Sequence, residues 1–192
     1  PGWDEDIRRS RPGLITSASM HSNRHPAGRL VLDAWQKDPA SIDRNGDGIL
    51  QYAMLEGEPG TRSLLRTEYS VKALTDAEVS VEKLASSTAN WNRGQASARV
   101  SLWIQEFGDQ IEVIFANNDD MALGAIDALK EAGISPLPLI VGVDATAPAL
   151  ESIAAGELYG TVLNDADGMA RSMVICPSPV VGDESSEAVN LQ

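Results

Sequence analysis

The chain of 192 residues is 43% hydrophobic, which is enough for one ordinary domain with its own core and short for two. Acidic residues outnumber basic ones 28 to 15, and the net charge of -13 argues against nucleic-acid binding because such a surface repels phosphate backbones. A single cysteine, Cys176, excludes an internal disulfide and a multi-cysteine metal site, and two histidines argue against a Ser-His-Asp machine or a zinc site.

No apolar run approaches the length of a membrane span, and no signal peptide opens the chain. We therefore expect no membrane-spanning segment. The sequence alone is consistent with a cytosolic protein and with a mature exported fragment.

Residues 1–23 show no clean hydrophobic period and predict an irregular lead-in. From Pro26 the pattern changes, because Leu30, Val31 and Trp35 fall on one helical face. Helical and short apolar segments then alternate to residue 175, and the Pro/Ser-rich acidic stretch 176–192 predicts a second irregular segment. The strands are expected at 49–57, 79–85, 111–116, 138–143 and 158–163, and the helices at 26–37, 61–77, 92–108, 119–133, 147–156 and 165–175.

This alternation predicts one α/β domain over residues 24–175, with helices on both faces of a parallel five-stranded sheet. In such a three-layer α/β/α fold, ligands lie beyond the carboxyl ends of the strands. The residues that follow each strand are therefore the first candidates for a binding site.

The stretch DRNGDGILQYAML, residues 43–55, is similar to a calcium-binding loop. Asp43, Asn45 and Asp47 alternate along it, and Gly48 supplies a sharp turn. An EF-hand loop needs a glutamate at its twelfth position, where this chain has Met54. The loop also leads into an apolar strand rather than a helix, which argues against a calmodulin-like sensor.

Ca²⁺ takes six to eight oxygen ligands, so the loop needs a carboxylate from elsewhere. The Ile49 carbonyl and the Gln51 side chain extend the set within the loop. Glu112 is the candidate for the remaining carboxylate, because it opens a strongly apolar strand where an acid is otherwise hard to justify. The alternative is that the loop is an Asx-turn without a metal.

Several segments together resemble the C-terminal lobe of the periplasmic galactose/glucose-binding proteins, the sugar receptors of ABC transporters. They are DRNGDGILQY, GEPG, RTEY, TANWN, IEVIFANNDDMALGAIDALK and GVDATAPALESIAAGELYGTVLND, and the resemblance runs from about residue 22 to about residue 171. It implies one lobe of a type I periplasmic binding protein, a non-enzymatic function, a hexose ligand, a transporter permease as partner and a periplasmic or extracellular location.

The resemblance also implies two sets of site residues. The calcium ligands correspond to Asp43, Asn45, Asp47, the Ile49 carbonyl, Gln51 and Glu112. The sugar contacts correspond to Arg66, Trp91, Asn118, Asp144 and Asn164.

The sugar set also makes chemical sense, because Asn118, Asp144 and Asn164 each follow an expected strand. Planar amide, carboxylate and guanidinium groups suit hydroxyls that both donate and accept, and an indole can stack on a pyranose. Taken singly, each residue also has a structural explanation. Asn118 and Asp144 could be helix N-caps, Trp91 a core residue and Arg66 a solvated helix residue.

Two departures from the family bear on function. The segment from Gly60 to Arg66 is one residue shorter than in the family and lacks its His and Asp. The other lobe of the family has no counterpart in the sequence. We therefore expect weak hexose binding, and we expect that the open cleft face could support a homodimer.

Three other functions are alternatives to sugar binding. A folded fragment without sugar binding is one alternative. The effector-binding core of a LacI-type regulator is another, although no helix-turn-helix is visible and the calcium loop points away from it. A hydrolase or transferase is disfavoured because no nucleophile elbow, P-loop or G-x-G-x-x-G is present.

Overall fold

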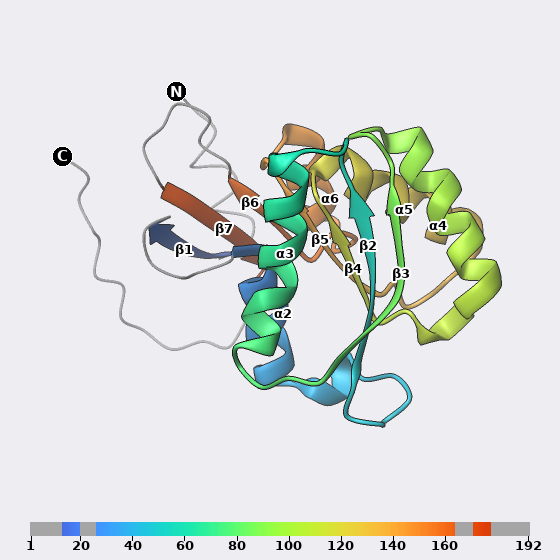
Figure 1. Ribbon diagram of the computed structural model, residues 1–192, viewed down its shortest axis with the longest axis horizontal. Helices are drawn as coiled ribbons and strands as arrows, with labels where there is room; N and C mark the ends of the chain where they lie inside the picture. The colour runs from blue at the N-terminus through green and yellow to red at the C-terminus, as the bar shows by residue number, and fades with distance from the viewer. Residues whose placement is uncertain (1–12, 20–25, 164–170, 178–192) are drawn as a thin grey trace.

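A single sheet runs through the middle of the protein, in a computed structural model that describes residues 13–19, 26–163 and 171–177 (Figure 1). The order of its strands is β1-β7-β6-β5-β4-β2-β3. The five strands from β3 to β6 are parallel, which confirms the predicted parallel five-stranded core. Their bounds are Leu50–Glu56 for β2, Val81–Thr88 for β3, Val113–Ala116 for β4, Leu139–Val143 for β5 and Gly160–Leu163 for β6.

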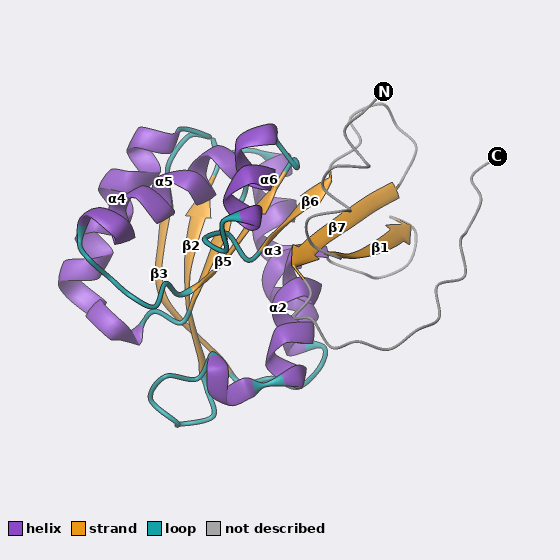
Figure 2. Cartoon of the chain, turned by 180° about the vertical axis from the view of Figure 1, so that it is seen from behind, coloured by secondary structure: helices purple, strands orange, loops and turns teal. Residues whose placement is uncertain are grey.

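Helices cover both faces of this sheet, giving the predicted three layers. On one face α2 and α3 pack against each other, and on the other face lie α4, α5 and α6 (Figures 1 and 2). The helices are α2 at Pro26–Lys37, α3 at Thr61–Thr75, α4 at Arg93–Phe107, α5 at Asp119–Glu131 and α6 at Ala147–Ala154, with short 3₁₀ turns at Pro39–Ser41 and Gly108–Gln110.

Strand β2 is buried on both faces of the sheet. Six of its seven residues are buried, as expected of a parallel strand covered on both faces. Tyr52 and Met54 belong to the cluster under α2 and α3, whereas Ala53 and Leu55 belong to the cluster under α4 and α5. Burying one such large side chain contributes about 1.5–3 kcal/mol. The two clusters form the core.

The two ends of α4 are set by the capping residues Asn92 and Gly108. The Asn92 side chain caps α4 by accepting the backbone N–H of Gln95 at 2.9 Å. Gly108 ends the same helix with φ at 53°, a left-handed conformation that favours glycine. The predicted end of this helix at Gly108 is therefore confirmed.

The structure differs from the sequence-based expectation at the sheet edge beyond β6. The helix expected at 165–175 is wrong over residues 171–175, because Arg171–Pro177 forms strand β7, antiparallel to β6, and residues 165–170 lie outside the described residues. Gly13–Ser19, expected in the irregular lead-in, forms β1 and pairs along β7. The segment around Val174 and Ile175 is β-branched, and the unpaired edge of β6 supplies a partner for it. Residues 178–192 of the expected tail lie outside the described residues.

Strands β2 and β4 connect two functional edges. Their amino ends meet the acidic loop that precedes β2, seen as the projecting loop at the bottom of Figure 1. Their carboxyl ends lead to Gly57 and Asn117. The predicted calcium residues therefore lie at the amino ends of these two strands, and the predicted sugar residue Asn118 lies just past the carboxyl end of β4.

Candidate functional site

An ion pair stands at the carboxyl edge of the parallel strands. Arg66, on α3, donates from Nη2 to Asp144 Oδ1 at 2.8 Å and from Nη1 to the backbone carbonyl of Asn117. The Arg66 side chain is 14% exposed and that of Asp144 34% exposed, so the pair is half-buried with one side open to solvent. Asp144 follows β5 directly, in a turn with φ at 114° that aims its carboxylate across the strand ends.

Trp91 lies beside this pair. The guanidinium carbon of Arg66 is 5.5 Å from the centroid of the indole ring, a cation–π arrangement. Asn90 and Trp91 occupy the turn after β3 with φ at 52° and 60°. A left-handed backbone is costly for a bulky residue. Trp91 is partly buried and packs against the core cluster under α4 and α5, while its ring also faces the Arg66 guanidinium at the site.

Asn118 performs the capping role that was the structural alternative for it. Its Oδ1 accepts the backbone N–H of Met121 at 3.0 Å as the N-cap of α5. Its Nδ2 also reaches the Trp91 carbonyl at 3.4 Å, which joins it to the cluster. The structure thus brings together Arg66, Trp91, Asn118 and Asp144, while Asn164 lies outside the described residues.

Asn117, which the sequence did not point to, lies at the centre of the cluster. Its side chain is 1% exposed, and its Oδ1 accepts the Ser63 hydroxyl at 2.8 Å and the Gly57 N–H at 3.3 Å. Its Nδ2 donates to the Thr67 hydroxyl at 3.2 Å. Asn117 therefore ties the end of β4 to α3 and to the turn after β2. Its position directly after an apolar strand, before Asn118, was the available signal.

Asp119, in the first turn of α5, binds two residues near the same edge of the sheet. It is fully buried, and it accepts the Thr161 hydroxyl at 2.5 Å and the Thr146 N–H at 2.7 Å. Burial raises the pKa of Asp119 to about 6, with a smaller contribution from the neighbouring charge of Asp144, while the two hydrogen bonds act in the opposite direction. Asp119 links β6 and the start of α6 to α5.

The acidic loop at the opposite edge folds around its own backbone. Asp43 accepts the N–H groups of Gly46 and Gly48 at 2.7 and 2.9 Å, and Asp47 accepts that of Ile49 at 2.7 Å. Asn45 donates to Asp47 Oδ2 at 3.0 Å. The bond from Ile49, as the largest cause, lowers the pKa of Asp47. These contacts are those of an Asx-turn. Asp47 Oδ2 accepts both the Asn45 and the Gln51 amides, so a cation at this oxygen would replace at least one of these donors.

Glu112, the residue predicted to supply the remaining carboxylate, contacts both ends of this loop. The residue is 1% exposed, and its two oxygens accept the backbone N–H groups of Arg44 at 2.6 Å and Gln51 at 2.9 Å. Burial raises the pKa of Glu112, and the charges of Asp43 and Asp47 add to the rise. A buried carboxylate near two others is a site where a cation is favourable.

The donor set is suited to a hard cation only if neutral oxygens take part. Within residues 13–19, 26–163 and 171–177, no three His, Cys, Asp or Glu side chains gather closely enough to form a metal cluster on their own. The Gln51 amide donates to Asp47 at 2.8 Å, so the Gln51 and Asp47 side chains lie next to each other in the loop. Carboxylate, amide and carbonyl oxygens are the ligands that Ca²⁺ takes. The calcium site stays a prediction.

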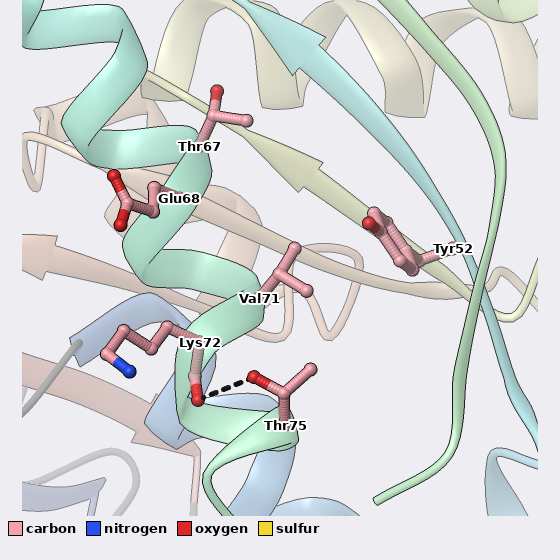
Figure 3. Close-up of a pocket in the computed structure, with 6 residues that line it drawn as sticks. All are labelled: Tyr52, Thr67, Glu68, Val71, Lys72 and Thr75. Atoms are coloured by element: carbon pink, nitrogen blue, oxygen red, sulfur yellow. Dashed lines mark hydrogen bonds between the residues drawn. The ribbon is translucent and has the colours of Figure 1, made fainter.

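A shallow groove lies between α3 and β2 (Figure 3). Val71 points toward the Tyr52 ring, whereas Glu68 and Lys72 lie on the other side of the helix. Lys72 is already paired with Asp76 at 2.8 Å. Thr67, at one end of the groove, accepts the Asn117 amide at 3.2 Å, so the groove adjoins the candidate site at the strand ends. Its lining residues are Tyr52, Thr67, Glu68, Val71, Lys72 and Thr75.

The fold and this edge define a class of protein. The periplasmic binding protein domain matches residues 26–175, and the chain belongs to that family. Among the described residues, no helix is both long enough and apolar enough to cross a membrane.

Relatives in this family bind small polyhydroxylated solutes. The chain is 41% identical over 149 residues to the D-galactose/methyl-galactoside binding periplasmic protein MglB of Haemophilus influenzae, covering 77% of this chain and 44% of that protein. It is 39% identical over 105 residues to a xylitol-binding protein of Mycolicibacterium smegmatis, covering 54% of this chain and 30% of that protein. The chain thus spans less than half the length of these curated relatives.

Solved structures give the same picture. An ABC transporter periplasmic solute binding protein from Actinobacillus succinogenes with bound D-allose matches with a TM-score of 0.60 and 28% identity, over 73% of this chain and 45% of that one. One from Bacillus halodurans with bound myo-inositol matches with a TM-score of 0.60 and 30% identity, over 76% and 48%. These relatives are binding proteins, as the non-enzymatic expectation required.

Proposed function

We propose that this lobe binds a hexose, galactose or glucose, through Arg66, Trp91, Asn118, Asp144 and Asn164. The observation that carries the proposal is the convergence of the Arg66–Asp144 pair with the Trp91 ring at one end of the sheet, from three separate elements. Donors on Arg66 and acceptors on Asp144 suit hydroxyls, which do both. Fixed charges that balance each other favour a neutral ligand over an ion.

The relatives support a sugar and leave its identity open. Their names and bound ligands include galactose, xylitol, D-allose and myo-inositol. All four are neutral polyols. The choice of galactose or glucose rests on the resemblance of the segments around Asp43, Trp91 and Asp144.

The test is a calorimetric titration with glucose and galactose, run on the calcium-loaded protein. Asp144→Ala and Trp91→Ala should each abolish the heat that either sugar produces. Asp127→Ala is the matched control, because Asp127 pairs with Arg93 at 2.6 Å on an exposed surface. A parent protein with no sugar-dependent heat or chemical-shift change at any accessible concentration would show that the lobe is a folded fragment without this activity.

A structural Ca²⁺ is the second part of the proposal, with ligands from Asp43, Asn45, Asp47, the Ile49 carbonyl, Gln51 and Glu112. The contacts of Glu112 with both ends of the loop support it. Bound there, the ion would tie the entry of β2 to the entry of β4. Its binding free energy then becomes folding free energy.

Partner and location follow from the family and are proposals for the whole protein. The relatives include periplasmic proteins and components of ABC transporters. We propose a periplasmic or extracellular location and a transporter permease as partner. A homodimer through the cleft face is a further proposal, and light scattering with and without sugar tests it.

A further inference from the structure

Gly57, at the end of β2, lies directly against the Trp91 ring. A methyl group on its Cα would lie 2.1 Å from Trp91 Cζ2 and 2.2 Å from Cε2 and Cη2. Side chains do not approach each other this closely. The φ angle of Gly57 is not in the left-handed region, so space and not backbone conformation requires glycine here.

The ring has little freedom to move away. Arg66 stands over it at 5.5 Å, and the Asn118 amide holds the Trp91 carbonyl at 3.4 Å. The backbone of Trp91 is already in a left-handed turn. A side chain at position 57 would therefore change the place of the indole relative to the Arg66 guanidinium.

Gly57 is fixed as well. Its N–H donates to Asn117 Oδ1 at 3.3 Å, and the same oxygen accepts the Ser63 hydroxyl at 2.8 Å. The Asn117 carbonyl in turn accepts Arg66. If the Gly57 backbone moved away from the ring, its buried hydrogen bond to Asn117 would break. This is unfavourable because no water can take the place of the lost partner.

We propose that Gly57 is a positioning residue of the ligand site. Because Gly57 has no side chain, the Trp91 ring can pack directly against its Cα. This position of the ring determines its distance and angle to the Arg66 guanidinium. Gly57 itself does not touch the ligand. The inference rests on the proposed function for one point, that Trp91 offers its ring to the sugar.

The experiment compares Gly57→Ala with Gly60→Ala. Gly60 is three residues further along the same turn, nothing lies within 4 Å of the place its Cβ would take, and its φ of 165° is extended backbone. The indole N–H signal of Trp91 is assigned in an NMR spectrum with the Trp91→Phe variant. We expect Gly57→Ala to shift this signal and to weaken galactose binding at least tenfold, and Gly60→Ala to leave both unchanged.

A second comparison separates positioning from general damage. Phenylalanine at position 91 lacks the indole atoms that a Cβ at position 57 would meet. Gly57→Ala should therefore lower the melting temperature of the parent and leave that of Trp91→Phe almost unchanged. This double variant remains decisive if Gly57→Ala alone fails to fold.

Three outcomes overturn the inference: an unmoved Trp91 signal, unchanged sugar affinity in Gly57→Ala, or equal destabilisation in the Trp and Phe backgrounds. If the parent binds no sugar, the proposed function fails. The ring signal and the melting comparison still decide whether Gly57 positions Trp91.

Discussion

The Arg66 guanidinium binds the Asp144 carboxylate at 2.8 Å, although 78 positions separate the two residues in the chain. The same guanidinium donates to the carbonyl of Asn117 and stands over the Trp91 ring. One side chain on α3 thus connects the ends of β4 and β5 with the turn after β3.

Removing the charge of Asp144 tests this arrangement. Asp144→Asn leaves Arg66 one acceptor but no balancing charge, so we expect the free energy of unfolding to fall by about 1 kcal/mol. Sugar affinity should fall at least tenfold. Asp127→Asn is the control, because its exposed pair with Arg93 contributes only about 0.2–1 kcal/mol. Urea unfolding and titration calorimetry measure the two effects, and full sugar affinity in Asp144→Asn would exclude the residue from the site.

Asn117 should matter for stability more than its small side chain suggests. Asn117→Ala leaves the Ser63 hydroxyl and the Gly57 N–H buried without their acceptor, at a cost of about 2–4 kcal/mol in the free energy of unfolding. Ser63→Ala removes one bond of the same group and should cost about 1 kcal/mol. Equal costs for the two variants in chemical denaturation would contradict the central role of Asn117.

Calcium should raise the stability of the protein. At one hundred times its dissociation constant, a ligand that binds only the folded state adds about 2.7 kcal/mol. A chelator should therefore lower the melting temperature, and Glu112→Gln should remove most of the calcium response. Asp109→Asn, an exposed acid three residues away, is the control. Melting curves that are identical with calcium and with excess chelator would leave the loop as a plain Asx-turn.

The raised pKa of Asp119 should make the free energy of unfolding depend on pH. Its pKa is about 6 in the folded protein and near 3.8 when unfolded, so the folded state holds its proton to higher pH. The contribution of this group to stability is fully present below about pH 4 and is lost as the pH rises through about 6. The loss amounts to about 3 kcal/mol.

Asp119→Asn isolates this effect from the other carboxylates. Urea unfolding of both proteins at pH 4 and pH 7 gives a difference in stability at each pH. We expect the parent to lose stability relative to the variant between the two values. A difference that is independent of pH would mean that Asp119 titrates normally.

Much of the fold follows from local pattern. The expected strand at 111–116 and helix at 119–133 correspond to β4 and α5, because a short apolar run and an amphipathic repeat report burial directly. The segment 165–175 shows the limit. Arg171–Pro177 is a strand because the edge of β6 pairs with it, and that edge is not visible in the local sequence.

The site shows the same limit in another form. Arg66 could be proposed from resemblance, and Asp144 from resemblance and from its place after a strand, since each carries its chemistry in its own side chain. Asn117 and Gly57 could not, because their importance lies in what surrounds them. A buried amide between two elements, and a glycine against an indole, are products of packing.

Sugar binding to this lobe should be weak, with a dissociation constant near the millimolar range. The pair that would grip the sugar is 14% and 34% exposed, so water competes for its hydrogen bonds. Each such bond nets about 0.5–1.5 kcal/mol, and one stacking contact adds about 1 kcal/mol. Three or four bonds and one ring then give about 4 kcal/mol, which corresponds to a dissociation constant of about 1 mM. Titration of the calcium-loaded protein with glucose and galactose, followed by NMR shifts of the Trp91 indole, measures this value. Micromolar binding would mean that a second wall, from residues beyond those described or from another copy of the chain, closes over the sugar.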